Sequence, residues 1–509
     1  MERSRNAINS IIFGFIFRLV TMVGPFITRI IVTWTIGKEF LGVSGVFSSI
    51  LSMLSLTELG FSSAISYKCY SLYAENNVVS IRRYLGFFRK IYRGIGTVII
   101  ILGVIITPFL SQIVSGEIPK CLNLYIIFYI YLFQTAISYY LAAYRAVIFT
   151  VSQRQDIESK IAVIWNSVMY LLQIILLLLF KNYYVYLIVL PITTIAINLS
   201  RIVISNKLYP ELKAEGDISK AEKKEIFQAI LPLIGHRLHG TIVISADNII
   251  ISMFLGVVMV ANYNNYFSII SALSGFIIAI YAAIQPGIGN SMATESMKKN
   301  RDNFEKISFA MIWIVGWMSI CLTCLFEDFI SLAYGNESNL GIGAVVLLVL
   351  EFYIWRTFDI VMTYRDVVGK WSGDTVIPYL SGAFNLITNL LLVKYIGIVG
   401  VILSTILTFV LFSIPYSIRV LFKKVFKSSL KNYLIKYICN TATVIVIGSV
   451  TYFVCNCIFL KEMFITLVIK CIICLLLPNL MFYFLWHNRE EYHYFKEKVI
   501  KPFIQKVKR

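Results

Sequence analysis

Long apolar runs separated by short polar segments form the pattern of this chain. A helix that crosses a bilayer needs about 20 mostly apolar residues. The runs also lack the apolar–polar alternation of a membrane β-strand. The pattern therefore predicts an all-α integral membrane protein with fourteen transmembrane helices. We expect them at residues 9–36, 41–67, 85–114, 121–149, 157–180, 184–205, 226–255, 258–287, 305–330, 341–364, 375–393, 397–418, 433–457 and 463–486.

Composition and charge are typical of a protein embedded in a lipid bilayer. Of the 509 residues, 58% are hydrophobic and only 14% are charged, and the mean hydropathy is +0.78. The net charge of +19 lies in short basic tracts between apolar runs, a distribution typical of an anionic membrane surface. We therefore expect membrane lipid as a partner and no nucleic acid.

The basic residues also predict an orientation. If the N-terminus is cytoplasmic, about 33 of the 46 Lys and Arg fall in inner segments and about five in outer loops. Both termini are then cytoplasmic. No loop is long enough for a soluble catalytic domain, and no P-loop motif occurs. The sequence therefore predicts no enzyme activity, no cofactor and no resident metal.

An internal repeat appears when the sequence is shifted so that Arg18 falls on Arg237 and Gly37 on Gly256. The shift spans six predicted helices, an even number, so the two copies have the same orientation. Parallel repeats are one known construction of transporters. We therefore expect two pseudo-symmetric six-helix lobes followed by two C-terminal helices. The predicted boundaries are an N-terminal lobe at 1–210, a cytoplasmic linker at 211–225, a C-terminal lobe at 226–420, two further helices within 433–486, and a basic cytoplasmic tail at 487–509.

Two arginines lie in the first apolar run. Arg18 and Arg29 are eleven residues apart, so they differ by about 20° around a helix. A charge near the middle of a bilayer costs at least about 2.5–3.5 kcal/mol, and such residues usually face a bundle interior or a wet cavity. We expect Arg18 and its repeat partner Arg237 to line such a cavity, whereas Arg29 could equally extend to the membrane surface. Pro25 between them is a predicted hinge.

Other polar groups inside apolar runs are candidates for ion coupling: Glu58, His236, Asp247, His239, Glu351 and Asp359. Alternatives stay open for three of them. Asp359 and Arg356 have the i,i+3 spacing of a self-neutralising pair. His236 and His239 have no third metal ligand in view and could titrate or simply pack. The pairs Cys321–Cys324 and Cys471–Cys474 are expected to act as small buried apolar groups.

Three stretches carry a resemblance to a known family. They are the R-x₆-P-x₃-R helix from Arg18 to Arg29 that leads to Gly37, the segment LTELGFSSAISYKCYSLYAENN at 56–77, and YRAVIFTVSQRQDIESKI at 144–161. Over essentially the whole chain, the sequence resembles the oligosaccharide-lipid flippases of the Wzx type. These polysaccharide transporters share a superfamily, the MOP superfamily, with the MATE multidrug exporters and the lipid II flippases.

The resemblance implies a function in the bacterial cytoplasmic membrane. Such proteins move undecaprenyl-pyrophosphate-linked oligosaccharide repeat units across the membrane by alternating access, for capsule, O-antigen or cell-wall polysaccharide. It implies that Arg18, Arg29, Arg145 and Arg237 meet the pyrophosphate or acidic sugars. The last two helices resemble the pair that in lipid II flippases forms a groove for the lipid tail. H⁺ or Na⁺ as a coupling ion and polymerase or glycosyltransferase partners would fit, and the alternatives are a cation-coupled MATE-type exporter or a lipid II flippase.

Overall fold

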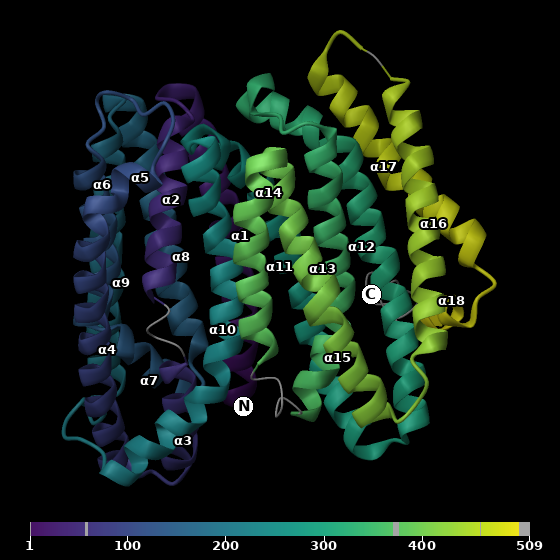
Figure 1. The fold of residues 1–509 in the computed structure, drawn as a ribbon. Coiled ribbons are helices and arrows are strands. Elements are labelled where there is room, and N and C mark those ends of the chain that lie inside the picture. Colours follow the sequence, from purple (N-terminus) through teal and green to yellow (C-terminus); the bar gives the residue numbers. More distant parts are fainter. Residues whose placement is uncertain (1, 56–59, 370–375, 459, 498–509) are drawn as a thin grey trace. The chain divides into compact units, whose positions relative to one another are not determined.

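The computed structural model describes residues 2–55, 60–369, 376–458 and 460–497 (Figure 1). Helices make up its regular structure, and the described part of the chain contains no strand. Glu58 lies outside the described residues, and so do the side chains of His236, Arg237 and His239. The all-helical class expected from the apolar runs is confirmed.

The chain forms two compact units. Unit 1 comprises Met1–Ala261 and Pro378–Gly382, and unit 2 comprises Asn262–Ile377 and Ala383–Arg509. The predicted lobe boundary at residues 211–225 falls inside unit 1, because the helix that follows it packs against the second helix of the chain. The lobe boundaries stay a prediction.

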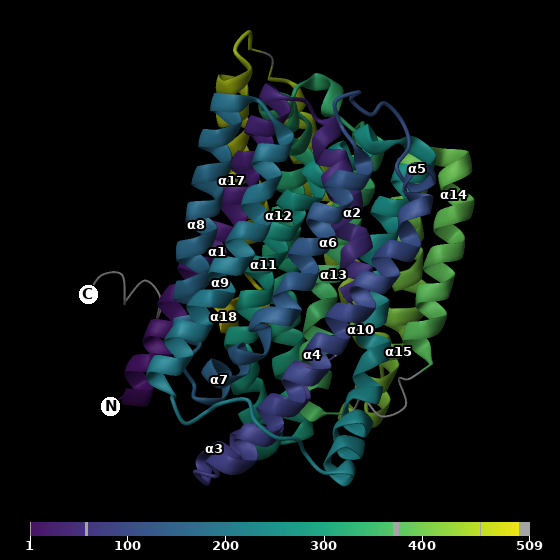
Figure 2. The ribbon, with the colours of Figure 1, turned by 90° about the vertical axis from the view of Figure 1, so that its left-hand side faces the viewer.

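Unit 1 consists mainly of long helices that pack side by side. α1 packs along α8, α8 on α9, α9 on α6, and α6 on α4, while α2 packs against α10 (Figure 2). The bounds are α1 Glu2–Thr35, α2 Glu39–Leu54, α3 Phe61–Ala74, α4 Val78–Ile106, η2 Thr107–Phe109, α5 Leu110–Ile113, α6 Leu124–Leu141, η3 Ala143–Arg145, α7 Ala146–Val151, α8 Gln155–Phe180, α9 Tyr183–Leu208 and α10 Lys220–Leu255.

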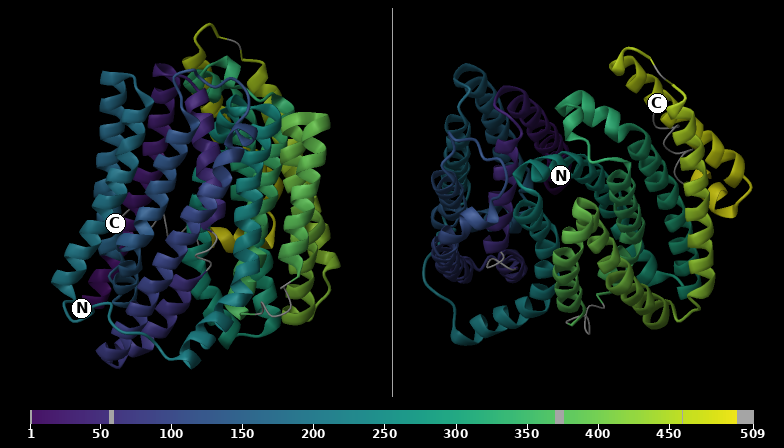
Figure 3. Two further views of the ribbon diagram at one scale, coloured as in Figure 1. Left: turned by 60° about the vertical axis from the view of Figure 1, so that its left-hand side comes forward. Right: turned by 45° about the horizontal axis from the view of Figure 1, so that its top comes forward.

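Unit 2 is built around α12, which packs against α13, α16 and α17. In Figure 3 the yellow C-terminal helices run beside the green helices of this unit. The bounds are α11 Val257–Thr294, α12 Met297–Tyr334, η4 Asn336–Ser338, α13 Ile342–Val368, α14 Ile377–Thr408, η5 Phe409–Ser413, α15 Ile414–Val420, η6 Leu421–Phe426, α16 Lys431–Asn456, α17 Met463–Trp486 and α18 Glu490–Phe495. The start of α11, up to Ala261, and Pro378–Gly382 of α14 belong to unit 1.

Ten helices of the described residues are long and apolar enough to cross a membrane, so the count of fourteen stays a prediction. The difference has structural reasons. The expected span 41–67 is divided between α2 and α3, and α13 carries Glu351, Arg356 and Asp359 within a short stretch. The expected spans 375–393 and 397–418 are counted as one element, Ile377–Phe426, although the backbone leaves the helical conformation at Ile396 and Gly397. The two halves lie side by side as a helical hairpin, since Ser404 Oγ donates to Asn389 Oδ1 at 2.6 Å. In α10, many side chains lie outside the described set.

The two glycines that the predicted repeat pairs both follow a helix with positive φ. Gly37 after α1 has φ +117°, and Gly256 after α10 has φ +85°. Both values lie in the range that glycine tolerates best. The positions are consistent with the repeat, which stays a prediction.

The segment between α9 and α10 is fixed to α4 by charge and backbone contacts. Asp217 accepts hydrogen bonds from Lys90 Nζ at 3.0 Å and Lys223 Nζ at 2.9 Å. Arg82 Nε donates to the Glu211 carbonyl at 2.6 Å. The bond from Lys223 is the main reason that the pKa of Asp217 lies below its ordinary value. The carboxylate therefore holds the linker at neutral pH.

We expect Asp217→Asn to release this linker. A carboxyl whose folded pKa is lowered stabilises the fold above its ordinary pKa, and this contribution disappears only as the pH falls through the lowered value. At neutral pH the variant should exchange the amide hydrogens of residues 211–219 roughly two- to five-fold faster, as expected for an exposed ion pair. Glu75→Gln, in the exposed turn between α3 and α4, is the control. Equal exchange in wild type and Asp217→Asn would contradict the anchoring role.

Candidate functional site

A polar cavity of about 420 Å³ lies inside unit 1. Its walls come from α1, α2, α6, α8 and α9. Pockets of a few hundred cubic ångströms with a few convergent polar groups are the usual form of a small-molecule site. The cavity is therefore the first candidate for substrate binding in this unit.

A second cavity of about 310 Å³ continues the first along α6. The two share Gln134 and Thr135. Further along, the lining includes Ser138 and Thr194 together with Tyr92 and Tyr139. The polar surface thus extends over several turns of α6, which is longer than a single small ion would need.

Arg29 of α1 provides the charge of this site. It is the sole charged side chain among the described residues that line the two cavities, and no carboxylate accompanies it there. Its Nη2 donates to the carbonyl of Ala261 at 3.3 Å, which fixes one side of the guanidinium. Because charges interact more strongly away from bulk water, the cavity favours an anion. A guanidinium suits phosphate in particular, since it can donate two parallel hydrogen bonds.

Hydroxyl groups of α2 form another wall. Ser44, Ser48 and Ser52 follow one another at intervals of four residues, so they share one helix face, and Ser55 continues the row. The hydroxyls of Ser44 and Tyr131 lie 2.5 Å apart. The sequence carried this signal, because three serines at intervals of four in an apolar run mark a polar stripe.

Aromatic and amide groups of α8 and α9 complete the lining. Gln173 Nε2 donates to the carbonyl of Tyr186 at 3.4 Å, and both residues face the cavity with Tyr170. The ring of Tyr170 lies so close to Gly24 that a Cβ on Gly24 would be 2.2 Å from the ring. Gly24 therefore makes room for Tyr170. Amides, hydroxyls and ring faces are groups that can hydrogen-bond and stack on sugars.

The predicted arginines whose side chains the structure describes lie in different surroundings. Arg29 lines the cavity with the predicted hinge Pro25, and α1 runs through Pro25 as one helix. Arg18 is an exposed residue of α1 outside both described linings. Arg145 Nη1 donates to Ser205 Oγ at 2.8 Å and to Asn206 Oδ1 at 2.5 Å, which ties η3 to α9. Substrate contacts of Arg18, Arg145 and Arg237 stay predictions.

The candidates for ion coupling are dispersed. Asp359 pairs with Arg356, with Oδ2 and Nη1 2.8 Å apart, so the ion pair expected from the i,i+3 spacing is present. Glu351 is a half-buried residue on the same helix, and Asp247 is buried on α10. None of these three carboxylates is among the described residues that line the polar cavities. Their role in coupling stays a prediction.

Unit 2 contains a cavity of a different kind. It also measures about 420 Å³ and lies between α12, α13 and α16. Side chains such as Ile320, Val346, Leu350 and Val444 make its surface mainly apolar. An apolar surface of this kind suits a hydrocarbon chain better than a sugar or a phosphate.

Comparison with known proteins places the chain in one family. Residues 8–292 match the family described as polysaccharide biosynthesis protein. An uncharacterized membrane protein of Methanocaldococcus jannaschii is 22% identical over 385 residues, which cover 71% of this chain and 74% of that protein.

Solved structures share the fold. The lipid II flippase MurJ in an inward closed conformation aligns with a TM-score of 0.67 at 13% identity, over 92% of this chain and 99% of that one. An inward-facing multidrug resistance MATE family transporter of the MOP superfamily aligns with a TM-score of 0.55 at 15% identity, over 77% and 92%. The chain therefore shares the fold of the lipid II flippase and MATE transporter structures, as the resemblance implied.

The close approach of Gly24 and Tyr170 generates a test of the cavity wall. Gly24→Ala should lower the free energy of unfolding by about 1–3 kcal/mol, the usual cost of overpacking, because the new Cβ overlaps the ring. Denaturation in detergent measures this. Gly14→Ala on the same helix is the matched control, since a Cβ there meets no atom within 4 Å. In a Tyr170→Ala background, Gly24→Ala should cost much less than it does in the wild type, because the overlapping ring is gone. An equal cost in both backgrounds would show that the wall is formed differently.

Proposed function

The chain belongs to the family of polysaccharide biosynthesis proteins, and from this premise we propose that it is a flippase for a lipid-linked oligosaccharide. The proposed cargo is an undecaprenyl-pyrophosphate-linked repeat unit, carried from the cytoplasmic to the outer leaflet for capsule, O-antigen or cell-wall polysaccharide. The proposed transport requires no catalytic residue, because no covalent bond changes.

The observation that carries this proposal is the composition of the unit 1 cavity. Arg29 supplies a positive charge, while Gln134, Gln173 and the serine face of α2 supply hydrogen-bonding groups that match sugar hydroxyls. The described lining contains no acidic residue that would repel a pyrophosphate. A cavity of this polarity fits a phosphorylated sugar.

The same polarity argues against the alternative of a cation exporter. Binding a cationic drug favours carboxylates or an electron-rich aromatic cage. Tyrosines are present, but the single charge of the described lining is positive. Lipid II, which also carries a pyrophosphate, remains a second candidate cargo because it would use the same charge.

The apolar cavity of unit 2 supports a lipid cargo. We assign it to part of the polyprenyl tail, which needs an apolar surface while the headgroup crosses in a polar one. α16, one of the two predicted additional C-terminal helices, contributes Val444, Ile445 and Gly448 to this surface. The assignment also gives these helices a role that a transporter of a soluble substrate would not need.

We further propose that the junction of α2, α10 and α11 is the gate that opens towards the outside. A Cβ on Gly42 would lie 1.9 Å from the carbonyl oxygen of Val257, so the two backbones are in direct contact. Asn248 Nδ2 donates to Ser49 Oγ at 2.9 Å. The predicted orientation puts this junction at the outer side. A seal made of glycine and small polar groups can separate without leaving a large apolar surface in water.

Arg29→Ala should reduce polymer export at least ten-fold, because one charge-assisted hydrogen bond to a phosphate contributes about 1.5–3 kcal/mol. Arg29→Lys should keep part of the activity, since the charge remains without the bidentate geometry. Export is measured as surface polymer in cells that depend on this protein, with its membrane level checked by immunoblot. Arg93→Ala, which removes an exposed arginine of α4, is the control. Normal export by Arg29→Ala would remove the proposed anion site.

Arg18→Ala and Arg237→Ala test the two arginines related by the repeat. If both meet the substrate, each variant inserts normally and loses export. Normal polymer export by both variants would show that neither arginine is needed, and the proposed anion site would then contain Arg29 without them.

Gly42→Val should prevent the proposed gate from sealing, because the new side chain overlaps the Val257 backbone. A cysteine introduced at Ser48, in the cavity lining, should then react faster with a membrane-impermeant thiol reagent added from outside. The background is a variant without native cysteines. Gly94→Val on α4, where a Cβ meets no atom within 4 Å, controls for the substitution itself. Equal labelling in both variants would contradict a gate at this junction.

A further inference from the structure

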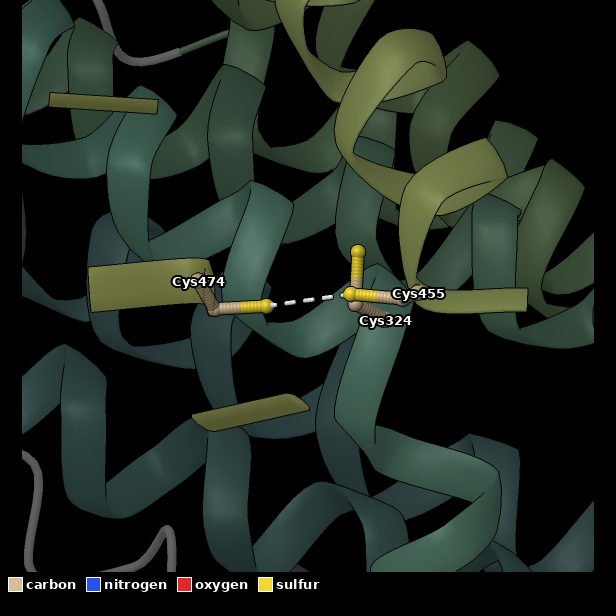
Figure 4. A group of neighbouring side chains, drawn as sticks. All are labelled: Cys324, Cys455 and Cys474. Atoms are coloured by element: carbon tan, nitrogen blue, oxygen red, sulfur yellow. Dashed lines mark hydrogen bonds between the residues drawn. The ribbon is translucent and has the colours of Figure 1, made fainter. Parts of the chain in front are cut away.

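Three buried cysteines of unit 2 meet at one point. Cys324 comes from α12, Cys455 from α16 and Cys474 from α17, and Figure 4 shows the sulfurs of Cys455 and Cys474 facing each other with Cys324 beside Cys455. All three sulfur atoms lie within 4.8 Å of one another. The Cys455 and Cys474 sulfurs are 3.9 Å apart, the contact drawn as a dashed line in Figure 4. They are separate thiols.

The packing of three helices creates this cluster. α12 packs against both α16 and α17, so residues far apart in sequence come together. Cys321 lies one turn before Cys324, and its sulfur contacts the Cys474 carbonyl at 3.6 Å. The sequence predicted two separate C-x-x-C pairs acting as apolar groups. The structure instead joins one cysteine of each pair to Cys455.

We propose that Cys324, Cys455 and Cys474 bind a soft monovalent metal ion, Cu(I). Thiolate ligands select soft cations such as Cu(I). Three sulfurs around a metal in one plane, with bonds of about 2.3 Å, stand about 4 Å from each other by trigonal geometry. The three thiols already lie close to that spacing, so small side-chain rotations suffice. Structural Zn²⁺ takes four ligands, whereas the described residues offer three here.

Charge limits how many of the thiols ionise. When Cu(I) binds, two thiols release their protons to water and two metal–thiolate bonds replace the two S–H bonds, because the thiolate is the form that ligates a metal. The product carries one negative charge, less than three thiolates would leave, and burying net charge in an apolar interior is costly. The nearby ammonium of Lys470, one turn before Cys474, is already neutralised by Asp328, with Nζ and Oδ2 2.6 Å apart. No oxidant or reductant is consumed.

The site adjoins the apolar cavity of unit 2. Thr323 and Tyr452 line that cavity, next to Cys324 on α12 and one turn before Cys455 on α16. A metal held by all three sulfurs would cross-link α12, α16 and α17 and so fix two walls of the cavity. This inference concerns metal binding and does not depend on the proposed flippase function.

The test uses the full chain purified in detergent under anaerobic, reducing conditions. Cu(I) is titrated in competition with a chromophoric Cu(I) chelator, and X-ray absorption measures the metal's ligands. We expect one Cu(I) per chain with two or three sulfur ligands at about 2.2–2.3 Å. Changing Cys324, Cys455 and Cys474 together to Ser should weaken binding at least 100-fold. The matched control changes three exposed cysteines, Cys121, Cys439 and Cys457, and should keep the site.

Single Ser variants at the three positions guard against a misfolded triple variant, and each should weaken binding while the melting temperature stays near that of wild type. Equal affinity in wild type and in the folded single variants would overturn the proposal. Mass spectrometry after mild oxidation provides a second readout. The proposal would also be overturned if the reduced protein bound no Cu(I) and mild oxidation formed a Cys455–Cys474 disulfide. That result would identify the two cysteines as a redox pair.

Discussion

The cationic side chain of Arg29 inside an apolar bundle is the constraint on which the account of this protein depends. A guanidinium within a membrane helix is costly unless polar groups surround it. Unit 1 meets this requirement with the Ala261 carbonyl and a cavity whose walls carry hydroxyls, amides and tyrosines. The described lining of this cavity contains no carboxylate, so its charge is positive and would attract an anion. This charge is the basis of the proposal that the cavity receives a phosphorylated substrate.

Two cavities of opposite character match the two chemical parts of a lipid-linked sugar. The polar cavity of unit 1 suits pyrophosphate and sugar, and the apolar cavity of unit 2 suits hydrocarbon. Glycines support this arrangement at the points of closest approach. Gly24 admits the Tyr170 ring to the cavity wall, and Gly42 allows α2 to touch the backbone of Val257. The proposed substrate site and the proposed gate therefore both involve α1 and α2.

Local sequence patterns predicted much of this structure. Apolar runs predicted the helices, and the repeat paired Gly37 with Gly256, which share a positive φ. The i,i+3 spacing predicted the Arg356–Asp359 pair. Each of these features depends on residues near one another in sequence or on a repeated segment, so periodicity reveals it. The division of the second apolar run into α2 and α3 was missed, because the run's hydropathy does not show a turn at Gly60.

Features that depend on tertiary packing could not be predicted in the same way. Gln134 and Gln173 lie in different helices, and only the packing of α6, α8 and α9 brings them to one cavity. Likewise, nothing in the sequence connects Cys455 with Cys324. Arg145 donates hydrogen bonds to Ser205 and Asn206, which the sequence did not indicate, and its substrate contact stays a prediction. A charged residue in an apolar run signals a polar environment without telling whether that environment is substrate or protein.

A structure of the protein in a lipid nanodisc with an undecaprenyl-pyrophosphate-linked sugar tests the central claim most directly. The account predicts phosphate density within hydrogen-bonding distance of the Arg29 guanidinium and sugar density along α6 and the serine face of α2. Density for the headgroup at another place, with the unit 1 cavity filled only by water, would contradict it.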